Sequence, residues 1–348
     1  MQNIYISSIK QRFNKMKYKN KTFLVTGGTG SFGKKLVQIL LEKYNPKKII
    51  IFSRDELKQH EMKIQDIFKK NIKKLRFFIG DIRDYERLDD AMFKVDYVIH
   101  AAALKQIDTS EYNPLEFVKT NVLGSSNVIK AAIKNNVEKL IGLSTDKAVS
   151  PANLYGATKL CADKLFISSN NYYGMERKTK ISIVRYGNVM GSRGSVIPFF
   201  KNYNKSKDIP ITDTRMTRFN LTIREGVEFV LSNLDKMLGS EIFIPKIKSY
   251  KILDLLESIR PDAKYKIVGI RNGEKLHEEM ISKDDARNTI EFDKFYIIYP
   301  SNIFSDKKYT SFIKKFIGKK TKKDFSYSSD NNEFLSINQI RKYLKSDD

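Results

Sequence analysis

The sequence TFLVTGGTGSFG, residues 22–33, joins a short apolar run to a glycine-rich turn. The run TFLVT predicts a buried strand, and the periodicity of residues 34–44 predicts a helix directly after the turn. Gly27, Gly30 and Gly33 give the G-x-x-G-x-x-G spacing of a dinucleotide-binding turn, because glycine lets backbone N–H groups approach a pyrophosphate at a helix N-terminus. A strand before this turn and a helix after it predict a nucleotide-binding α/β fold.

Further apolar runs repeat the strand pattern along the first half of the chain. They fall at residues 48–52, 75–79, 95–100, 140–144 and 181–185. Segments with helical periodicity separate them, chiefly residues 55–71 and 114–135. This alternation predicts a Rossmann-type, doubly wound parallel sheet, in which ligands bind at the carboxyl edge of the strands.

The end of the second strand bears on the choice of cofactor. NAD-specific sites usually place a carboxylate there, about twenty residues after the glycine turn, to bond the ribose hydroxyls. Ser53 and Arg54 occupy this place and Asp55 comes one residue late. Because a hydroxyl and a guanidinium suit a 2′-phosphate, the pattern favours NADP over NAD. The alternative is that Arg54 is only a solvated surface residue.

Other strand ends complete the expected cofactor site. Asp81 can accept a hydrogen bond from the adenine amino group, and the small residues Ala101 and Ala102 let a cofactor lie against the backbone. The predicted cofactor-binding residues are Gly27, Thr29, Gly30, Ser31, Phe32, Gly33, Ser53, Arg54, Asp55, Glu56, Leu57, Lys58, Asp81, Ile82, Ala101, Ala102, Lys105, Tyr155 and Lys159.

The stretch LSTDKAVSPANLYGATK, residues 143–159, holds the candidate catalytic groups. Tyr155 and Lys159 are four residues apart, which places them on one face of a helix. An ammonium near a tyrosine hydroxyl favours the phenolate, so we expect the pKa of Tyr155 to fall. Such a tyrosine can take a proton from a sugar hydroxyl while hydride leaves the carbon. Tyr-x-x-x-Lys also occurs by chance on surface helices, but the glycine turn upstream supports the catalytic interpretation.

Charge and composition exclude several classes. The net charge of +24 could indicate a nucleic-acid partner, but the lysines are spread along the chain without an aromatic-interleaved basic motif or zinc-ligand spacing. We therefore expect no nucleic acid and no metal. No apolar run approaches the ~20 residues that span a bilayer, so stable membrane insertion is not expected. A single cysteine allows no internal disulfide and fits a cytoplasmic setting.

The chain divides by composition into four parts. Residues 1–21 are basic and predict a flexible extension. Residues 22–197 predict the NADP-binding domain, and residues 198–300 predict a smaller substrate-binding lobe, with the chain crossing between the two. Residues 301–348 form a lysine-rich extension, in which the polar stretch 326–333 predicts a mobile segment.

Ten stretches of the chain carry a family resemblance, covering roughly residues 21–300. They resemble the extended short-chain dehydrogenase/reductase superfamily and, within it, the soluble, configuration-inverting UDP-N-acetylglucosamine 4,6-dehydratases of bacterial surface-glycan synthesis. The STDKA run is the most specific, because ordinary sugar-nucleotide epimerases lack its Asp-Lys pair. The stretches are TGGTGSFGK, FSRDELKQ, FFIGDIRD, HAAALKQ, EYNPLEFVKTNVLG, LSTDKAVSPANLYGATK, VRYGNVMGSRGSVIPFF, ITDTRMTRF, EIFIPK and GEKLHEEMI.

The chain departs from the usual family pattern at three positions. Asn220 stands where the family has Trp, and Asp108 and Asn272 stand where it has Pro. These differences concern substrate fit more than chemistry, since they fall outside the expected catalytic residues.

The resemblance implies a lyase mechanism without net oxidation of the substrate. Tyr155, assisted by Lys159, takes the proton of the 4-hydroxyl while hydride passes to NADP. Lys147, if neutral, removes the proton on carbon 5, and Asp146 protonates the departing 6-hydroxyl before hydride returns to carbon 6. This requires the pKa of Lys147 to be lowered and that of Asp146 to be raised. Thr145 is the remaining catalytic candidate.

The resemblance also implies a substrate site and an assembly. The substrate is UDP-N-acetylglucosamine and the protein is a homo-oligomer, from dimer to hexamer, serving glycan or pseudaminic acid synthesis. The implied substrate-binding residues are Lys105, Ser144, Thr145, Asn188, Arg193, Ser195, Val196, Arg271 and Glu274.

Three alternatives stay open. A retaining 4,6-dehydratase is disfavoured, because such relatives carry transmembrane helices and many have Met where Tyr155 stands. A UDP-sugar 4-epimerase would keep Tyr155 and Lys159 but would not need Asp146 and Lys147. A catalytically silent dinucleotide-binding regulator is disfavoured, because every proposed catalytic residue is retained.

Overall fold

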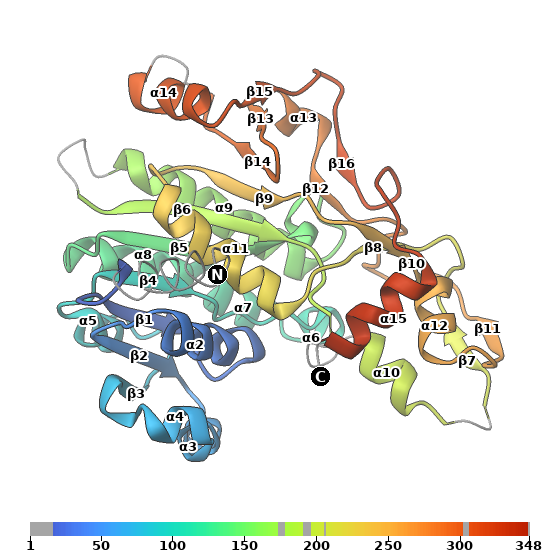
Figure 1. The fold of residues 1–348 in the computed structure, drawn as a ribbon, viewed down its shortest axis with the longest axis horizontal. Coiled ribbons are helices and arrows are strands. Elements are labelled where there is room, and N and C mark those ends of the chain that lie inside the picture. Colours follow the sequence, from blue (N-terminus) through green and yellow to red (C-terminus); the bar gives the residue numbers. More distant parts are fainter. Residues whose placement is uncertain (1–16, 173–177, 191–195, 205–206, 302–305, 347–348) are drawn as a thin grey trace, which may run out of the picture.

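The computed structural model describes residues 17–172, 178–190, 196–204, 207–301 and 306–346 (Figure 1). Its centre is a ten-stranded sheet in the order β15-β13-β14-β9-β6-β5-β4-β1-β2-β3. The parallel strands are β1 (Thr22–Thr26), β2 (Lys48–Ser53), β3 (Leu75–Ile79), β4 (Tyr97–His100), β5 (Lys139–Thr145), β6 (Lys180–Tyr186) and β9 (Ile242–Pro245). The antiparallel strands are β13 (Thr289–Glu291), β14 (Phe295–Ile298) and β15 (Lys319–Lys320).

The predicted doubly wound sheet is confirmed. The chain leaves β1 for β2 and β3, then returns to the other side of β1 as β4. Because the chain changes direction there, the connections after β1 and β4 separate and leave a crevice at the carboxyl edge of the sheet.

Alternating residues of the strands supply two cores, one on each face. Phe23 and Val25 of β1 face one side with α2 (Ser31–Lys43) and α11 (Ile223–Lys236), whereas Leu24 faces the other. The helices on that second face are α5 (Tyr85–Met92), α8 (Gly124–Lys134) and α9 (Leu154–Tyr172). Covering helices on both faces explain why these strands are almost continuously apolar.

Two expected helices are interrupted. Residues 55–71 form α3 (Glu56–Ile64) and α4 (Asp66–Lys70), because Gln65 is extended with ψ 137° between them. Residues 114–135 form α7 (Pro114–Phe117), the π-helical segment η2 (Val118–Leu123) and α8. The other short helices before α9 are η1 (Ile72–Lys74), α6 (Ile107–Tyr112) and η3 (Asp146–Ala148).

The lobe that the sequence predicts to bind substrate, which we call the substrate lobe, lies at the right of Figure 1 and is assembled from separate segments. Its elements are α10 (Val196–Asn202), β7 (Ile209–Ile211), β8 (Thr217–Phe219), β10 (Ser249–Lys251), α12 (Ile252–Ile259), β11 (Tyr265–Ile267) and β12 (Glu279–Ile281). The chain does cross between the parts: α11 and β9 return to the main sheet, and β13 and β14 return again after α13 (Lys283–Ala286). The predicted boundary after residue 197 is therefore not a single division, because the chain returns to the main sheet twice after it.

Parts of both predicted extensions are packed. Tyr18 is buried against Phe23 and Tyr97, while residues 1–16 lie outside the described residues. The C-terminal part forms α14 (Lys307–Lys315), β15, β16 (Tyr327–Ser328) and α15 (Ile337–Ser346). The expected mobile stretch 326–333 is wrong as a prediction, because β16 pairs with β12 and Tyr327 enters the core. Within the described part of the chain, no helix is long and apolar enough to cross a membrane.

Candidate active site

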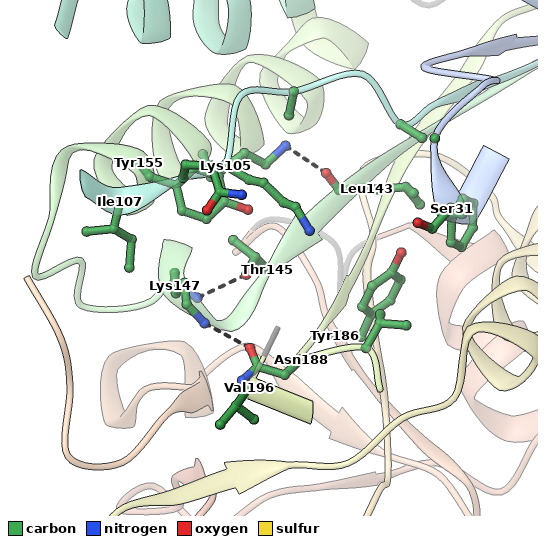
Figure 2. Close-up of a pocket in the computed structure, with 18 of the residues that line it drawn as sticks. Ser31, Lys105, Ile107, Leu143, Thr145, Lys147, Tyr155, Tyr186, Asn188 and Val196 are labelled. Carbon is green, nitrogen blue, oxygen red and sulfur yellow. Dashed lines mark hydrogen bonds between the residues drawn. The ribbon is translucent and has the colours of Figure 1, made fainter. Parts of the chain in front are cut away.

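A cavity of about 890 Å³ lies at the carboxyl edge of the parallel strands, where the substrate lobe meets the sheet. Its walls come from the turn after β1, the ends of β2 to β6, the start of α9 and the lobe. Figure 2 shows Lys105, Thr145, Tyr155 and Lys147 converging on one part of it from different elements. Its lining includes both the glycine turn and Glu278 of the lobe, and its volume lies in the range of ligand pockets.

The glycine turn fits a dinucleotide. Gly27 has φ +66°, and a Cβ on it would lie 2.9 Å from the backbone nitrogen of Ala102. A Cβ on Gly33 would lie 2.6 Å from the carbonyl oxygen of Gly27. The turn therefore has room only for glycine, and its backbone leads into the N-terminus of α2, where the helix dipole favours a phosphate.

Some of the predicted cofactor residues after the second strand line the cavity and others do not. Arg54 lines it, with Nη1 3.5 Å from Asp81 Oδ2. Asp55 caps α3 by accepting from the backbone nitrogen of Lys58 at 2.9 Å, and its other oxygen lies 2.6 Å from Lys58 Nζ. Its charge is thus already paired. Glu56 and Leu57 are exposed on α3 and do not line the cavity, so the prediction that they bind the cofactor is not supported.

Tyr155 and Lys159 both line the cavity from α9, as their spacing predicts. The pKa prediction is wrong: burial raises the pKa of Tyr155 to about 12, although Lys147 and a hydrogen bond with Thr145 act in the opposite direction. The ammonium of Lys159 instead donates to the carbonyl oxygen of Leu143 at 2.7 Å (Figure 2). Burial lowers the pKa of Lys159, while Asp163 opposes this shift.

Lys147 lies at the centre of a hydrogen-bonded cluster that we call the Lys147 cluster: Asp146, Lys147, Asn188 and Glu278. Its Nζ lies 3.2 Å from Asp146 Oδ1, 3.1 Å from Asn188 Oδ1 and 3.0 Å from Glu278 Oε1. Burial alone disfavours the charged form of Lys147, but the two carboxylates outweigh burial and raise its pKa. The expectation of a lowered pKa is therefore wrong, and Lys147 rests as a cation.

Asp146 lies behind Lys147. It is fully buried, is not among the residues that line the cavity, and its Oδ2 has no hydrogen-bond partner among the described residues. Burial raises its pKa, as predicted, with the charge of Glu278 adding to the effect and Lys147 opposing it. Its position disfavours the implied role of direct proton donor to a sugar, because its carboxylate contacts Lys147 and Thr145 but does not line the cavity.

Glu278 is a site residue that the sequence analysis did not identify. It lines the cavity but is only 2 % exposed, and Arg218 Nε lies 3.7 Å from the same oxygen that faces Lys147. Burial disfavours its charge, but Lys147 and Arg218 together lower its pKa. The only sequence signal was its place in the GEKLHEEMI stretch, since nothing local links that stretch to Lys147.

The implied substrate residues are mostly at the cavity. Those that line it are Lys105, Ser144, Thr145, Asn188, Val196, Arg271 and Glu274. Burial and the charge of Lys147 lower the pKa of Lys105. Arg193 and Ser195 lie outside the described residues. Two of the departures from the family pattern, Asp108 and Asn272, line the cavity, whereas Asn220 is buried. No group of His, Cys, Asp and Glu in the described part of the chain could hold a metal ion.

Known proteins resemble the chain over nearly its whole length. A family model described as "Polysaccharide biosynthesis protein" matches residues 23–300. A Campylobacter jejuni protein named UDP-N-acetylglucosamine 4,6-dehydratase (inverting) is 56% identical over 319 residues, covering 90% of this chain and 94% of that protein. A Rickettsia canadensis protein named UDP-glucose 4-epimerase is 39% identical, covering 93% and 95%. The crystal structure of Pen from Bacillus thuringiensis is 36% identical, with a TM-score of 0.84, covering 94% and 99%.

Proposed function

The chain belongs to the polysaccharide biosynthesis protein family, and we propose that within it the protein is a UDP-N-acetylglucosamine 4,6-dehydratase that inverts carbon 5. The observation that carries this proposal is that Lys147, Glu278 and Tyr155 line one cavity, while Asp146 pairs with Lys147 from outside the cavity lining. Oxidation at carbon 4 needs only Tyr155, whereas loss of water needs a further proton-exchanging group. The product, a 4-keto-6-deoxy sugar nucleotide, suits bacterial surface-glycan or pseudaminic acid synthesis.

The cofactor in this proposal is NADP. The glycine turn would hold the pyrophosphate, and Arg54 and Ser53 would meet the 2′-phosphate. When bound, the oxidised nicotinamide supplies a hydride acceptor whose positive ring also favours the phenolate of a nearby tyrosine. The pairing of Asp55 with Lys58 supports NADP over NAD. The ammonium of Lys58 balances the negative charge of Asp55, which would otherwise repel the 2′-phosphate of NADP.

Tyr155 acts first in the proposed mechanism. As the phenolate, Tyr155 takes the proton of the sugar 4-hydroxyl, so that the carbon 4 hydrogen can leave as hydride. Thr145 hydrogen-bonds to Tyr155, and Lys147 provides the positive charge that opposes its raised pKa. Lys159 is better placed to bind the cofactor than to tune Tyr155, since its ammonium is held at Leu143.

Lys147 acts second, and it starts as an ammonium rather than as the neutral amine that we expected from the sequence. It rests as an ammonium, so it must pass a proton to a neighbouring carboxylate before its nitrogen can accept the proton of carbon 5. Such a transfer inside an ion pair leaves the net charge unchanged. The ammonium formed again can then protonate the departing 6-hydroxyl, and water leaves. Once carbon 6 has regained the hydride, a proton from solvent on the opposite face of carbon 5 completes the inversion. Tyr155 releases to solvent the proton that it took from the 4-hydroxyl, so the protons balance.

The test is the reaction of the purified protein with UDP-N-acetylglucosamine and NADP in heavy water, followed by NMR. We expect a 4-keto-6-deoxy product with deuterium at carbon 5 and inverted configuration, while absorbance at 340 nm stays near baseline. A product that keeps its 6-hydroxyl and is inverted at carbon 4 would identify a 4-epimerase instead, the second candidate suggested by the Rickettsia relative. Stoichiometric growth of the 340 nm band would identify a simple dehydrogenase.

A further inference from the structure

Glu278 reaches the Lys147 cluster from a different part of the molecule. Asp146 and Lys147 follow β5 of the Rossmann sheet, whereas Glu278 immediately precedes β12 of the substrate lobe. The backbone of Glu278 is fixed on both sides by Ser329: its nitrogen donates to Ser329 Oγ at 2.9 Å, and its carbonyl accepts from Ser329 N at 2.8 Å. The C-terminal segment therefore sets the position of this carboxylate.

The segment leading to Glu278 is also tied to the loop after Lys147. Asn153 Nδ2 donates to the carbonyl of Gly273 at 2.7 Å, and Lys275 Nζ donates to the carbonyl of Val149 at 2.5 Å. These contacts flank the ion pair between Lys147 and Glu278. The lobe is thus joined to the catalytic loop at the point where its carboxylate meets the ammonium.

The two carboxylates of the cluster share an unusual feature. Glu278 Oε2 and Asp146 Oδ2 are both buried without a hydrogen-bond partner among the described residues. A buried carboxylate with an unpaired oxygen is unfavourable while it is charged, and protonation of the group would remove part of that penalty. Lys147 Nζ lies 3.0 Å from the other oxygen of Glu278, Oε1, and Arg218 Nε lies 3.7 Å from it, so Glu278 can take the proton at Oε1 without breaking another hydrogen bond. Of the two, only Glu278 also lines the cavity.

We propose that Glu278 is a positioning residue for the dehydration step: the substrate lobe supplies through it the carboxylate that accepts the Lys147 proton and returns it. In the forward direction an N–H bond of Lys147 breaks and an O–H bond forms on Glu278. The freed lone pair then takes the carbon 5 proton, whose bonding electrons pass to the enolate. When the ammonium has protonated the departing hydroxyl, Glu278 returns its proton to the amine. No proton is gained from or lost to solvent in this exchange.

The inference rests on the proposed function and predicts a separation of the two chemical steps. Glu278→Gln keeps the size and an acceptor oxygen for Lys147 but cannot take up the proton. We expect normal oxidation at carbon 4, little change in KM, and a fall of ~10²-fold in carbon 5 exchange and in kcat, the low end of a general acid–base contribution. Reduced cofactor should accumulate at 340 nm in the first turnover. Glu278→Asp, which keeps the charge, should restore part of the exchange.

The matched control is Glu279→Gln, the same change one residue along, where the carboxylate accepts from Ser150 Oγ at 3.2 Å. It should leave both steps within threefold of the unmodified protein. If Glu278→Gln behaves like the control, or loses both steps in parallel with a raised KM, Glu278 only joins the lobes and the inference is wrong. Should Glu278→Gln not fold, as judged by circular dichroism, Glu278→Asp must still lose exchange more than oxidation. Absence of dehydration by the unmodified protein would instead refute the proposed function itself.

Discussion

Lys159 and Leu143 are joined by a partly buried hydrogen bond of 2.7 Å, which the ammonium donates to the backbone carbonyl. The lysine four residues after Tyr155 is therefore not the cation that acts on it. Lys147, from the end of the neighbouring strand, is the cation that lowers the pKa of Tyr155 against the effect of burial. This assignment reverses the usual expectation from the Tyr-x-x-x-Lys spacing.

The first prediction concerns the pH profile of hydride transfer. Tyr155 must lose its proton to act as a base, so the rate should fall as the pH drops through its pKa. Lys147→Met removes the cation that lowers this pKa, and we expect the acid limb to move to higher pH. Lys159→Met should weaken cofactor binding but leave the limb in place. Absorbance at 340 nm in the first turnover, measured by rapid mixing from pH 6 to 10, compares the rates on the acid side of this pKa, where a higher pKa gives a slower rate at every pH. A shift with Lys159→Met alone would contradict the assignment.

The second prediction concerns cofactor choice. If Arg54 meets the 2′-phosphate, Arg54→Ala should remove a charge-assisted hydrogen bond worth ~1.5–3 kcal/mol, and the preference for NADP over NAD should narrow by roughly ten- to a hundredfold. The control is Arg76→Ala, an exposed arginine of β3 that does not line the cavity. Calorimetric titration of each protein with both cofactors gives the ratio. Equal affinity of the unmodified protein for NAD and NADP would contradict the role of Arg54.

The parts of the fold that local pattern determines could be predicted from the sequence. The strands β1 to β6 are apolar runs between helices, and the glycine turn requires a backbone that only glycine accommodates, as Gly27 shows. The strands β9, β13 and β14 could not be assigned to the main sheet, because each is short and their link to that sheet depends on pairings distant in sequence, of β14 with β9 and of β9 with β6. Likewise, nothing in the composition of residues 326–333 reveals that Tyr327 would be buried.

The candidate site divides in the same way. Tyr155 and Lys147 could be found because their spacing and strand-end position are local features. Glu278 could not, because its contact with Lys147 depends on how the lobe folds back over the sheet. The pKa of Lys147 was mispredicted for the same reason: the carboxylates that raise it come partly from that lobe. The pKa of a side chain depends on all the groups that surround it in the folded protein, whereas a sequence motif identifies only the side chain itself.

The third prediction separates Lys147 from Asp146. Lys147→Ala removes the group that exchanges the carbon 5 proton, so we expect ~10²–10⁴-fold slower dehydration and almost no deuterium at carbon 5 in heavy water. Oxidation at carbon 4 should persist when the pH is raised, because the higher pH compensates for the higher pKa that Tyr155 has without Lys147. Asp146→Asn should have a smaller effect, because Asp146 does not line the cavity. NMR of the product measures both. Normal deuterium uptake by Lys147→Ala would make Lys147 a structural lysine and the mechanism wrong.

The fourth prediction concerns the buried pair that supports the site from behind. Asp163 Oδ2 lies 3.2 Å from Arg185 Nη2 and accepts from Ser144 Oγ at 2.7 Å, at the strand end that carries Thr145. Both charged side chains are 4 % exposed, so neither is solvated by water.

Asp163→Asn should leave the buried Arg185 with only Asp285 as a counter-charge, whose Oδ2 lies 3.6 Å from Arg185 Nη1. Because removal of one partner of a buried pair typically destabilises by ~3–5 kcal/mol, we expect a loss of up to that size. The control is Asp284→Asn: this carboxylate lies 3.6 Å from Arg287 but is 94 % exposed, so solvent screening should make its loss negligible. Urea unfolding of both variants, followed by circular dichroism, compares them. We expect a clearly lower midpoint for Asp163→Asn with an unchanged slope. A midpoint equal to that of Asp284→Asn would mean that Arg185 is satisfied by its bond to the carbonyl of Met280 at 3.0 Å, and that Asp163 is dispensable for stability.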